Sequence, residues 1–239
     1  MNDMTSPEKA AMREFIANRG IRRLVHFTSR RNLIGIFKLG ALVARQKVQK
    51  YAEANCEEDL MAILKWNDRL RLDGRKDCIN LSIEQINGFL FDVFRKKFEE
   101  EFHDEEPWCV IEIDPDVLLM PGVVFTTSNA ASSYVRAHGT APGLKGLQAL
   151  YAQRIVTPTI RSTRIDERSL DMPDACPTSR QAEALVPGEI PLSRILGLVF
   201  MSEEDRIGVN VMLEMQFPGM KLPPMRVSED EFRGPSKEV

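Results

Sequence analysis

The stretch Gln181-Ala-Glu-Ala-Leu-Val186 places a single carboxylate, Glu183, inside an otherwise apolar run that Pro187-Gly188 ends. A short apolar run bounded by a turn signal is typical of a buried strand. Burying an unpaired charge is very costly, so Glu183 must face a cleft or have a partner. A strand-end glutamate that points to solvent is the alternative. The sequence therefore predicts a strand here. It does not decide whether the Glu183 carboxylate faces a cleft or the solvent.

Other apolar runs predict further strands, interleaved with helical patterns. The order of elements favours one α+β domain over residues 1–232, with mixed and largely antiparallel sheets flanked by helices, and a flexible tail at 233–239. The predicted strands are Ile21–Phe27, Asp77–Ile83, Trp108–Ile113, Val123–Phe125 and Ile195–Phe200. The predicted helices beyond the first two are Glu57–Trp66, Glu84–Glu101, Asn129–Arg136, Gly146–Arg154 and one after Ser202.

The first helix has two possible starts. Thr5 as N-cap makes a capping box with Glu8, whereas Ser6 as N-cap puts a proline at the first helical position. Gly20 is expected to end this helix as a left-handed cap. Thr28 or Ser29 can serve as the N-cap residue of the second helix.

Two regions carry no regular pattern. Residues 41–56 are expected to form a mobile loop, and residues 155–180, polar and interrupted by three prolines, a long irregular connection. Long loops in compact domains are often functional.

Composition limits the class of protein. The chain has 239 residues, 43% hydrophobic and 28% charged, which suits an ordinary soluble protein with a sizeable core. Its four cysteines have no paired spacing, so neither a zinc site nor a disulfide framework is indicated. The sequence shows no signal-peptide pattern and no run long enough to span a membrane, and the expected compartment is the cytoplasm.

Charge is unevenly distributed although the formal net charge is only -3. Residues 21–50 contain eight Lys or Arg and no acidic residue, whereas six of the eight residues at 99–106 are acidic. A basic face of this kind attracts phosphates, but two unlike solvated faces are the alternative.

Three separated segments together resemble the DarT-type ADP-ribosyltransferases, bacterial toxins that use NAD to modify DNA bases. The first is His26-Phe-Thr28, followed by Asn32 and, at a helix end, Gly40. The second runs from Asn67-Asp-Arg-Leu-Arg-Leu-Asp-Gly74 into Ile79-Asn-Leu-Ser82. The third is the stretch around Glu183. Order and spacing fit over roughly residues 21–200, and the runs Trp108–Pro115 and Thr127–Ser132 are similar to one branch.

The resemblance implies an ADP-ribosyltransferase-like fold, NAD as co-substrate and no metal. Cleavage of the bond between nicotinamide and ribose develops positive charge on the ribose, and a fixed carboxylate stabilises it. Glu183 is implied for this role, or for taking a proton from the attacking base. Arg71 is implied as the catalytic arginine that also clamps the cofactor, with Arg69 as its rival. The other implied NAD-binding residues are His26, Thr28, Asn32, Gly40 and Ser82.

The basic segment after Gly40 suits a groove for single-stranded DNA. Arg45, Lys47 and Lys50 would contact phosphates, and Tyr51 would stack on a base. An enzyme reaches base ring atoms only after unstacking, so single strands are the expected substrate. The strand at 79–82 lacks the aromatic residues of many members, and the resemblance leans towards the guanine-modifying branch.

A toxin of this kind implies a partner, and the resemblance points to a macrodomain antitoxin that removes the ADP-ribose. The toxin itself is expected to be monomeric. Three other functions stay open: an ADP-ribosyltransferase that acts on RNA or protein, a non-catalytic nucleic-acid-binding module of the same fold, and an NAD hydrolase.

Overall fold

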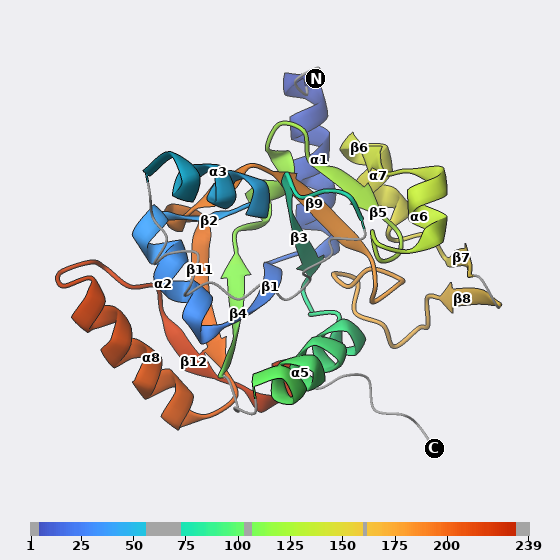
Figure 1. Ribbon diagram of the computed structural model, residues 1–239. Helices are drawn as coiled ribbons and strands as arrows, with labels where there is room; N and C mark the ends of the chain where they lie inside the picture. The colour runs from blue at the N-terminus through green and yellow to red at the C-terminus, as the bar shows by residue number, and fades with distance from the viewer. Residues whose placement is uncertain (1–4, 56–72, 103–106, 160–161, 233–239) are drawn as a thin grey trace.

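The computed structural model describes residues 5–55, 73–102, 107–159 and 162–232 (Figure 1). Within them, eight strands form one sheet in the order β12-β11-β4-β1-β3-β9-β5-β6, and only β11 and β12 pair in parallel. Two small two-stranded sheets, β2–β10 and β7–β8, accompany it. The predicted α+β class with largely antiparallel sheets is confirmed.

The strands are β1 (Leu24–Ser29), β2 (Ala41–Val43), β3 (Cys78–Ile83), β4 (Trp108–Ile113), β5 (Val124–Thr126), β6 (Ala141–Pro142), β7 (Arg154–Pro158), β8 (Thr163–Glu167), β9 (Glu183–Pro187), β10 (Glu189–Pro191), β11 (Ile195–Phe200) and β12 (Met225–Val227). The α-helices are α1 (Ser6–Arg19), α2 (Arg30–Leu39), α3 (Arg45–Asn55), α5 (Gly88–Phe102), α6 (Ser133–His138), α7 (Gly143–Ala149) and α8 (Glu203–Gln216).

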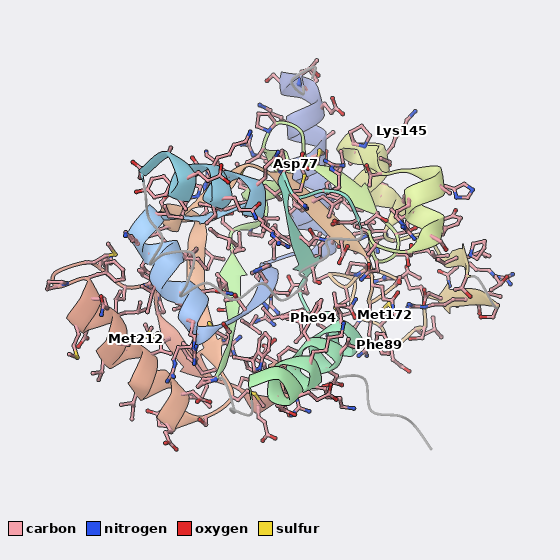
Figure 2. All side chains as sticks on the ribbon, in the orientation of Figure 1. Asp77, Phe89, Phe94, Lys145, Met172 and Met212 are labelled. Atoms are coloured by element: carbon pink, nitrogen blue, oxygen red, sulfur yellow. The ribbon has the colours of Figure 1, made fainter. Side chains whose placement is uncertain are left out.

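Side-chain alternation along the strands sends apolar residues to both faces of the sheet. In β4, Cys109, Ile111 and Ile113 join the large core, which also takes buried side chains from α1, α2, α7 and α8. Trp108 and Val110 join a smaller core beneath α5. Figure 2 labels two phenylalanines of α5, of which Phe94 is buried in that smaller core and Phe89 is 65% exposed.

The sheet is incompletely paired at its centre. β1 pairs with β4 over six residues, and β3 pairs with β9 over four, but β1 and β3 share only the pairs Leu24–Ile83 and Val25–Ser82. Beyond Val25 the two strands separate. We call the unpaired boundary between β1 and β3 the seam. It divides the sheet into the halves β12-β11-β4-β1 and β3-β9-β5-β6.

Local signals at helix ends are mostly confirmed. Thr5 is the N-cap of α1, and its hydroxyl accepts a hydrogen bond from the Glu8 N–H at 3.4 Å. Gly20 and Gly40 end α1 and α2 in the left-handed conformation. Ser202 caps α8, whose first turn is acidic. Ser29, and not Thr28, is the N-cap residue of α2, although its side chain makes no capping hydrogen bond.

Other predictions need correction. Residues 41–56 are not an irregular loop, because they contain β2 and α3. Within 155–180, β7 and β8 pair as a hairpin. The helix expected from Glu84 begins at Gly88, since Glu84 adopts a positive φ and its carboxylate accepts the backbone N–H groups of Arg22 and Arg23.

Two predicted helices after β5 are displaced. The helix expected at 129–136 occupies 133–138, because Ser132 caps it by accepting from the Val135 N–H at 3.2 Å. The helix expected at 146–154 occupies 143–149. The predicted helix at 57–66 and the tail at 233–239 lie outside the described residues. No helix in the described ranges combines the length and the apolar character needed to cross a membrane.

Candidate active site

The seam opens into a cavity of about 230 Å³. β1 and α2 form one wall, and β3 with the start of β9 forms the other. The segment from Ala41 to Arg45 and the first half of α5 also contribute, as do Asp73 and Asn129. Of the sequence-predicted residues, the structure brings together His26, Thr28, Asn32, Arg45, Ser82 and Glu183.

Glu183 lies in this cavity and not at the surface. It is the first residue of β9, opposite Thr126 of β5, and is only 4% exposed. Its Oε2 accepts hydrogen bonds from the Ala130 N–H at 2.8 Å and from Asn80 Nδ2 at 3.3 Å. These bonds compensate for lost hydration and fix the carboxylate's position. The solvent-facing alternative is therefore wrong.

Asn80 connects the two walls of the cavity. Its side-chain amide also lies 3.4 Å from Asp73 Oδ2, and its backbone carbonyl accepts from His26 Nδ1 at 3.0 Å. Because a carbonyl can only accept, Nδ1 of His26 carries a proton. The imidazole thus bridges the seam where the strands have ceased to pair, and its orientation is set by the backbone of β3.

Thr28 and Asn32 act as a pair on the α2 side. Asn32 Nδ2 donates to Thr28 Oγ1 at 2.9 Å, four residues earlier and in β1. Thr28 is 3% exposed, so the donation holds a buried hydroxyl at the cavity wall. Either side chain has further polar capacity for a ligand.

Ser82 and Gly40 differ in position. Ser82 lines the cavity and points to the same face of β3 as Asn80, as the period of two predicts. Gly40, with a φ of 69°, ends α2 and is not among the lining residues described. Its carbonyl accepts from the Leu192 N–H at 3.0 Å, which suits a structural role. Arg71 and Arg69 lie outside the described residues.

A cysteine also lines the cavity. Burial raises the pKa of the Cys78 thiol, partly opposed by Arg75, whose Nη2 donates to the sulfur at 3.0 Å. The thiol is thus protonated at neutral pH and is a poor nucleophile. No cluster of three or more His, Cys, Asp or Glu that could hold a metal ion occurs in the described parts of the chain.

The basic segment does not form one face. Arg23 is half-buried, and its guanidinium donates to the carboxylates of Glu112 and Glu231. These ion pairs give Arg23 a structural role. Lys47 Nζ pairs with Glu189 Oε2 at 2.7 Å. Lys50 and Tyr51 are exposed on α3, whereas Arg45 lines the cavity. The four predicted DNA contacts are therefore divided between the cavity and the surface.

Sequence reasoning missed several contributors to the cavity. The Ala130 N–H donates a hydrogen bond to Glu183. Asn129, the residue before it, lines the cavity, and so does Asp73. The sequence gives the run Thr127–Ser132 a likeness to one branch and predicts a helix from Asn129, but it does not indicate a contact with Glu183. A backbone donor leaves no side-chain signature, so its function was not recognisable before the fold was known.

A family model described as "DarT: ssDNA thymidine ADP-ribosyltransferase, DarT" matches residues 25–233, which is most of the chain. The chain belongs to the DarT family. This family transfers ADP-ribose to single-stranded DNA, and the match extends from β1, which carries His26, past the whole cavity.

Solved DarT structures share the fold. Thermus sp. 2.9 DarT in complex with carba-NAD+ is 18% identical, with a TM-score of 0.59, over 89% of this chain and 98% of that one. The same protein in complex with ADP-ribosylated ssDNA is 17% identical, with a TM-score of 0.54, over 90% and 97%. Thermosipho africanus DarTG in complex with ADP-ribose is 15% identical, with a TM-score of 0.50, over 88% of this chain and 51% of that longer one.

These identities are low, so the structural likeness supports the fold alone. A search of curated proteins gives no significant match. The family description names thymidine, and the lean towards a guanine-modifying DarT branch finds no support in it.

Proposed function

We propose that this chain is an NAD-dependent ADP-ribosyltransferase that modifies thymine bases of single-stranded DNA. The observation that carries the proposal is the buried carboxylate of Glu183, held by Ala130 and Asn80 in a cavity that His26 and Thr28 also line. The choice of thymine follows the description of the family, and guanine is the alternative acceptor.

The proposed reaction breaks the bond between the nicotinamide nitrogen and ribose C1′, and nicotinamide leaves with the bonding electrons. Positive charge then develops on the ribose, which the fixed Glu183 carboxylate stabilises without reorganising. A base nitrogen forms the new bond to C1′ and loses its proton. Glu183 is placed to take that proton, so it supplies charge stabilisation, base catalysis or both.

The other residues of the cavity bind and orient NAD in this proposal. His26 is held by the Asn80 carbonyl, and Thr28 by Asn32, so both present polar groups at fixed positions. Ser82 lies on the β3 wall near the reacting end. Fixed groups lower the entropic cost of alignment. Arg71, and Gly40 through the end of α2, keep their predicted roles as proposals.

Single-stranded DNA is proposed to approach along the exposed side of α3, where Lys50 and Tyr51 are accessible. We further propose that the protein is a monomeric toxin of the cytoplasm, where NAD and DNA meet. A macrodomain antitoxin that removes the ADP-ribose would complete a toxin–antitoxin pair, and the DarTG neighbour supports this pairing.

The test is incubation with NAD labelled in the adenylate and with single-stranded oligomers that contain thymine or guanine as the sole candidate base. Label is expected on the thymine oligomer and is expected to be lost with Glu183→Gln, which removes the charge at nearly constant shape. Glu204→Gln, an exposed change on α8, is the matched control.

Other results would redirect the proposal. Label on the guanine oligomer alone would show that guanine, and not thymine, is the acceptor base. NAD consumed without label on DNA would indicate hydrolysis or an acceptor in RNA or protein, and intact NAD with bound DNA would indicate a non-catalytic binding module.

A further inference from the structure

Arg45 differs from the other basic residues of its segment in facing the cavity. Among the described residues that line this space it is the only lysine or arginine, while Glu183 and Asp73 are acidic. The basic sequence around Arg45 predicts a contact with DNA. Its position in the fold instead places it against a ligand bound in the cavity.

The helical period separates Arg45 from the exposed cations. At about 100° per residue, Val48 and Ala52 lie within about 60° of Arg45, and both are buried. Lys47 and Lys50 lie about 140° or more away and are exposed. Helix α3 therefore has an inner face with one cation and an outer face with two.

Two backbone hydrogen bonds fix where the inner face meets the cavity. The Ala44 N–H donates to the Gly188 carbonyl at 2.8 Å, and the Gln46 N–H donates to the Lys76 carbonyl at 2.9 Å. Arg45 thus lies between the end of β9 and the approach to β3. In Figure 2, Asp77 marks this end of β3.

Glu183 lies at the opposite end of β9. Glu183 and Gly188 are five residue steps apart, which corresponds to roughly 16 Å of extended chain. The guanidinium reaches from one end of this span into the cavity, and the carboxylate occupies the other. A ligand that contacts both must be elongated, with its anionic part away from the reacting carbon.

The first turn of α3 does not supply an alternative anion site. The N–H of Gln46 donates to Lys76, and those of Lys47 and Val48 donate to the Ala44 carbonyl. The cationic group that lines the cavity at this end is the guanidinium of Arg45, and its planar fork suits two phosphate oxygens.

We propose that Arg45 binds the diphosphate of NAD and is not a DNA-backbone contact. This inference rests on the proposed function and assigns one part of the cofactor to one end of the cavity. Glu183 meets the ribose that reacts, and Arg45 meets the diphosphate beyond it. NAD and DNA then bind to opposite faces of the same helix.

The test compares the affinities of wild type, Arg45→Gln, Arg45→Lys and Lys50→Gln for NAD, ADP-ribose and a thymine oligomer. Nicotinamide is measured in parallel because it lacks phosphate. Arg45→Gln is expected to raise the Kd for NAD and ADP-ribose by about tenfold to a hundredfold, as for a lost charge-assisted hydrogen bond, and to leave nicotinamide and DNA unchanged. Arg45→Lys should recover part of the affinity.

Lys50→Gln is expected to show the opposite pattern. DNA affinity should fall, with a salt dependence smaller by about one ion, while NAD binding stays at the wild-type value. Its exposed site makes it a matched control for the loss of one positive charge from α3.

The inference would be overturned if Arg45→Gln weakened DNA binding and left NAD and ADP-ribose unchanged. An equal loss for nicotinamide and ADP-ribose would also overturn it, because a misfolded cavity would affect both. Failure of the proposed function is distinguishable, since wild type would then bind NAD without transferring ADP-ribose to any oligomer.

Discussion

Asn80→Asp tests whether the charges around the seam are arranged as described. The substitution keeps the shape of the side chain but places a third carboxylate beside Asp73 and Glu183, at 3.4 and 3.3 Å from the present amide nitrogen. With an effective dielectric constant of about 20, each such pair repels by about 5 kcal/mol. The new carboxyl is therefore expected to take up a proton.

Protonation limits the cost and makes it depend on pH. At pH 7 an aspartic acid with an ordinary pKa of about 3.9 costs about 4 kcal/mol to keep neutral, and at pH 5 about 1.5 kcal/mol. The folded-state pKa of this carboxyl is expected to be raised, so the charge-dependent part of the destabilisation is absent below about pH 4 and grows as pH rises. Wild type minus variant should thus differ by up to about 4 kcal/mol at pH 7.

The assay is urea unfolding of wild type, Asn80→Asp and Asn80→Ala at pH 5, 6 and 7. Asn80→Ala loses the same hydrogen bonds without adding a charge, so its destabilisation is expected to be nearly independent of pH. A penalty for Asn80→Asp that stays constant from pH 5 to 7, in parallel with alanine, would refute the proposed proximity of the three groups.

Three further predictions concern the framework. Asn87→Ala should cost about 1 kcal/mol in urea unfolding, since Asn87 Oδ1 accepts the third N–H of α5 at 3.1 Å, and Asn87→Ser should retain most of it. Burial opposes ionisation of Glu112, but hydrogen bonds from two arginines outweigh it and lower its pKa; its contribution is present above the unfolded pKa and lost as pH falls through the folded pKa, so Glu112→Gln should flatten the acid limb of a stability–pH curve. Gly146→Ala puts a Cβ 2.2 Å from a backbone carbonyl and should cost about 1–3 kcal/mol, whereas Gly208→Ala meets nothing within 4 Å and should stabilise α8 by about 0.5–1 kcal/mol in the same assay.

Local chemistry was predictable where one residue decides the structure. Thr5, Gly20 and Ser202 act within a turn of their own helix, so their sequence neighbours are sufficient evidence. Helix α3 was missed because only Val48 and Ala52 of its residues are fully buried, which leaves a faint apolar pattern.

Elements that depend on distant partners were also missed. β2 has three residues and pairs with β10, far along the chain. The hairpin β7–β8 has a polar, largely exposed surface and no apolar run to indicate it.

The candidate site shows the same division. The family pattern placed His26 and Glu183 in one cavity, as the structure does. The Ala130 N–H and the Asn80 carbonyl that hold them are main-chain groups, whose contacts depend on the register between strands. The pattern likewise gave no means of separating Arg45 from Lys50, since that distinction depends on which face of α3 meets the sheet.

The connectivity across the seam affects how the cavity can move. In chain order β1, β4 and β11 belong to one half of the sheet, and β3, β5 and β9 to the other, so the strand order passes between halves four times. Neither half is a continuous stretch of sequence, and the halves cannot swing apart as two independent lobes on one hinge. Binding in the cavity is therefore not expected to involve the closure of one lobe upon another.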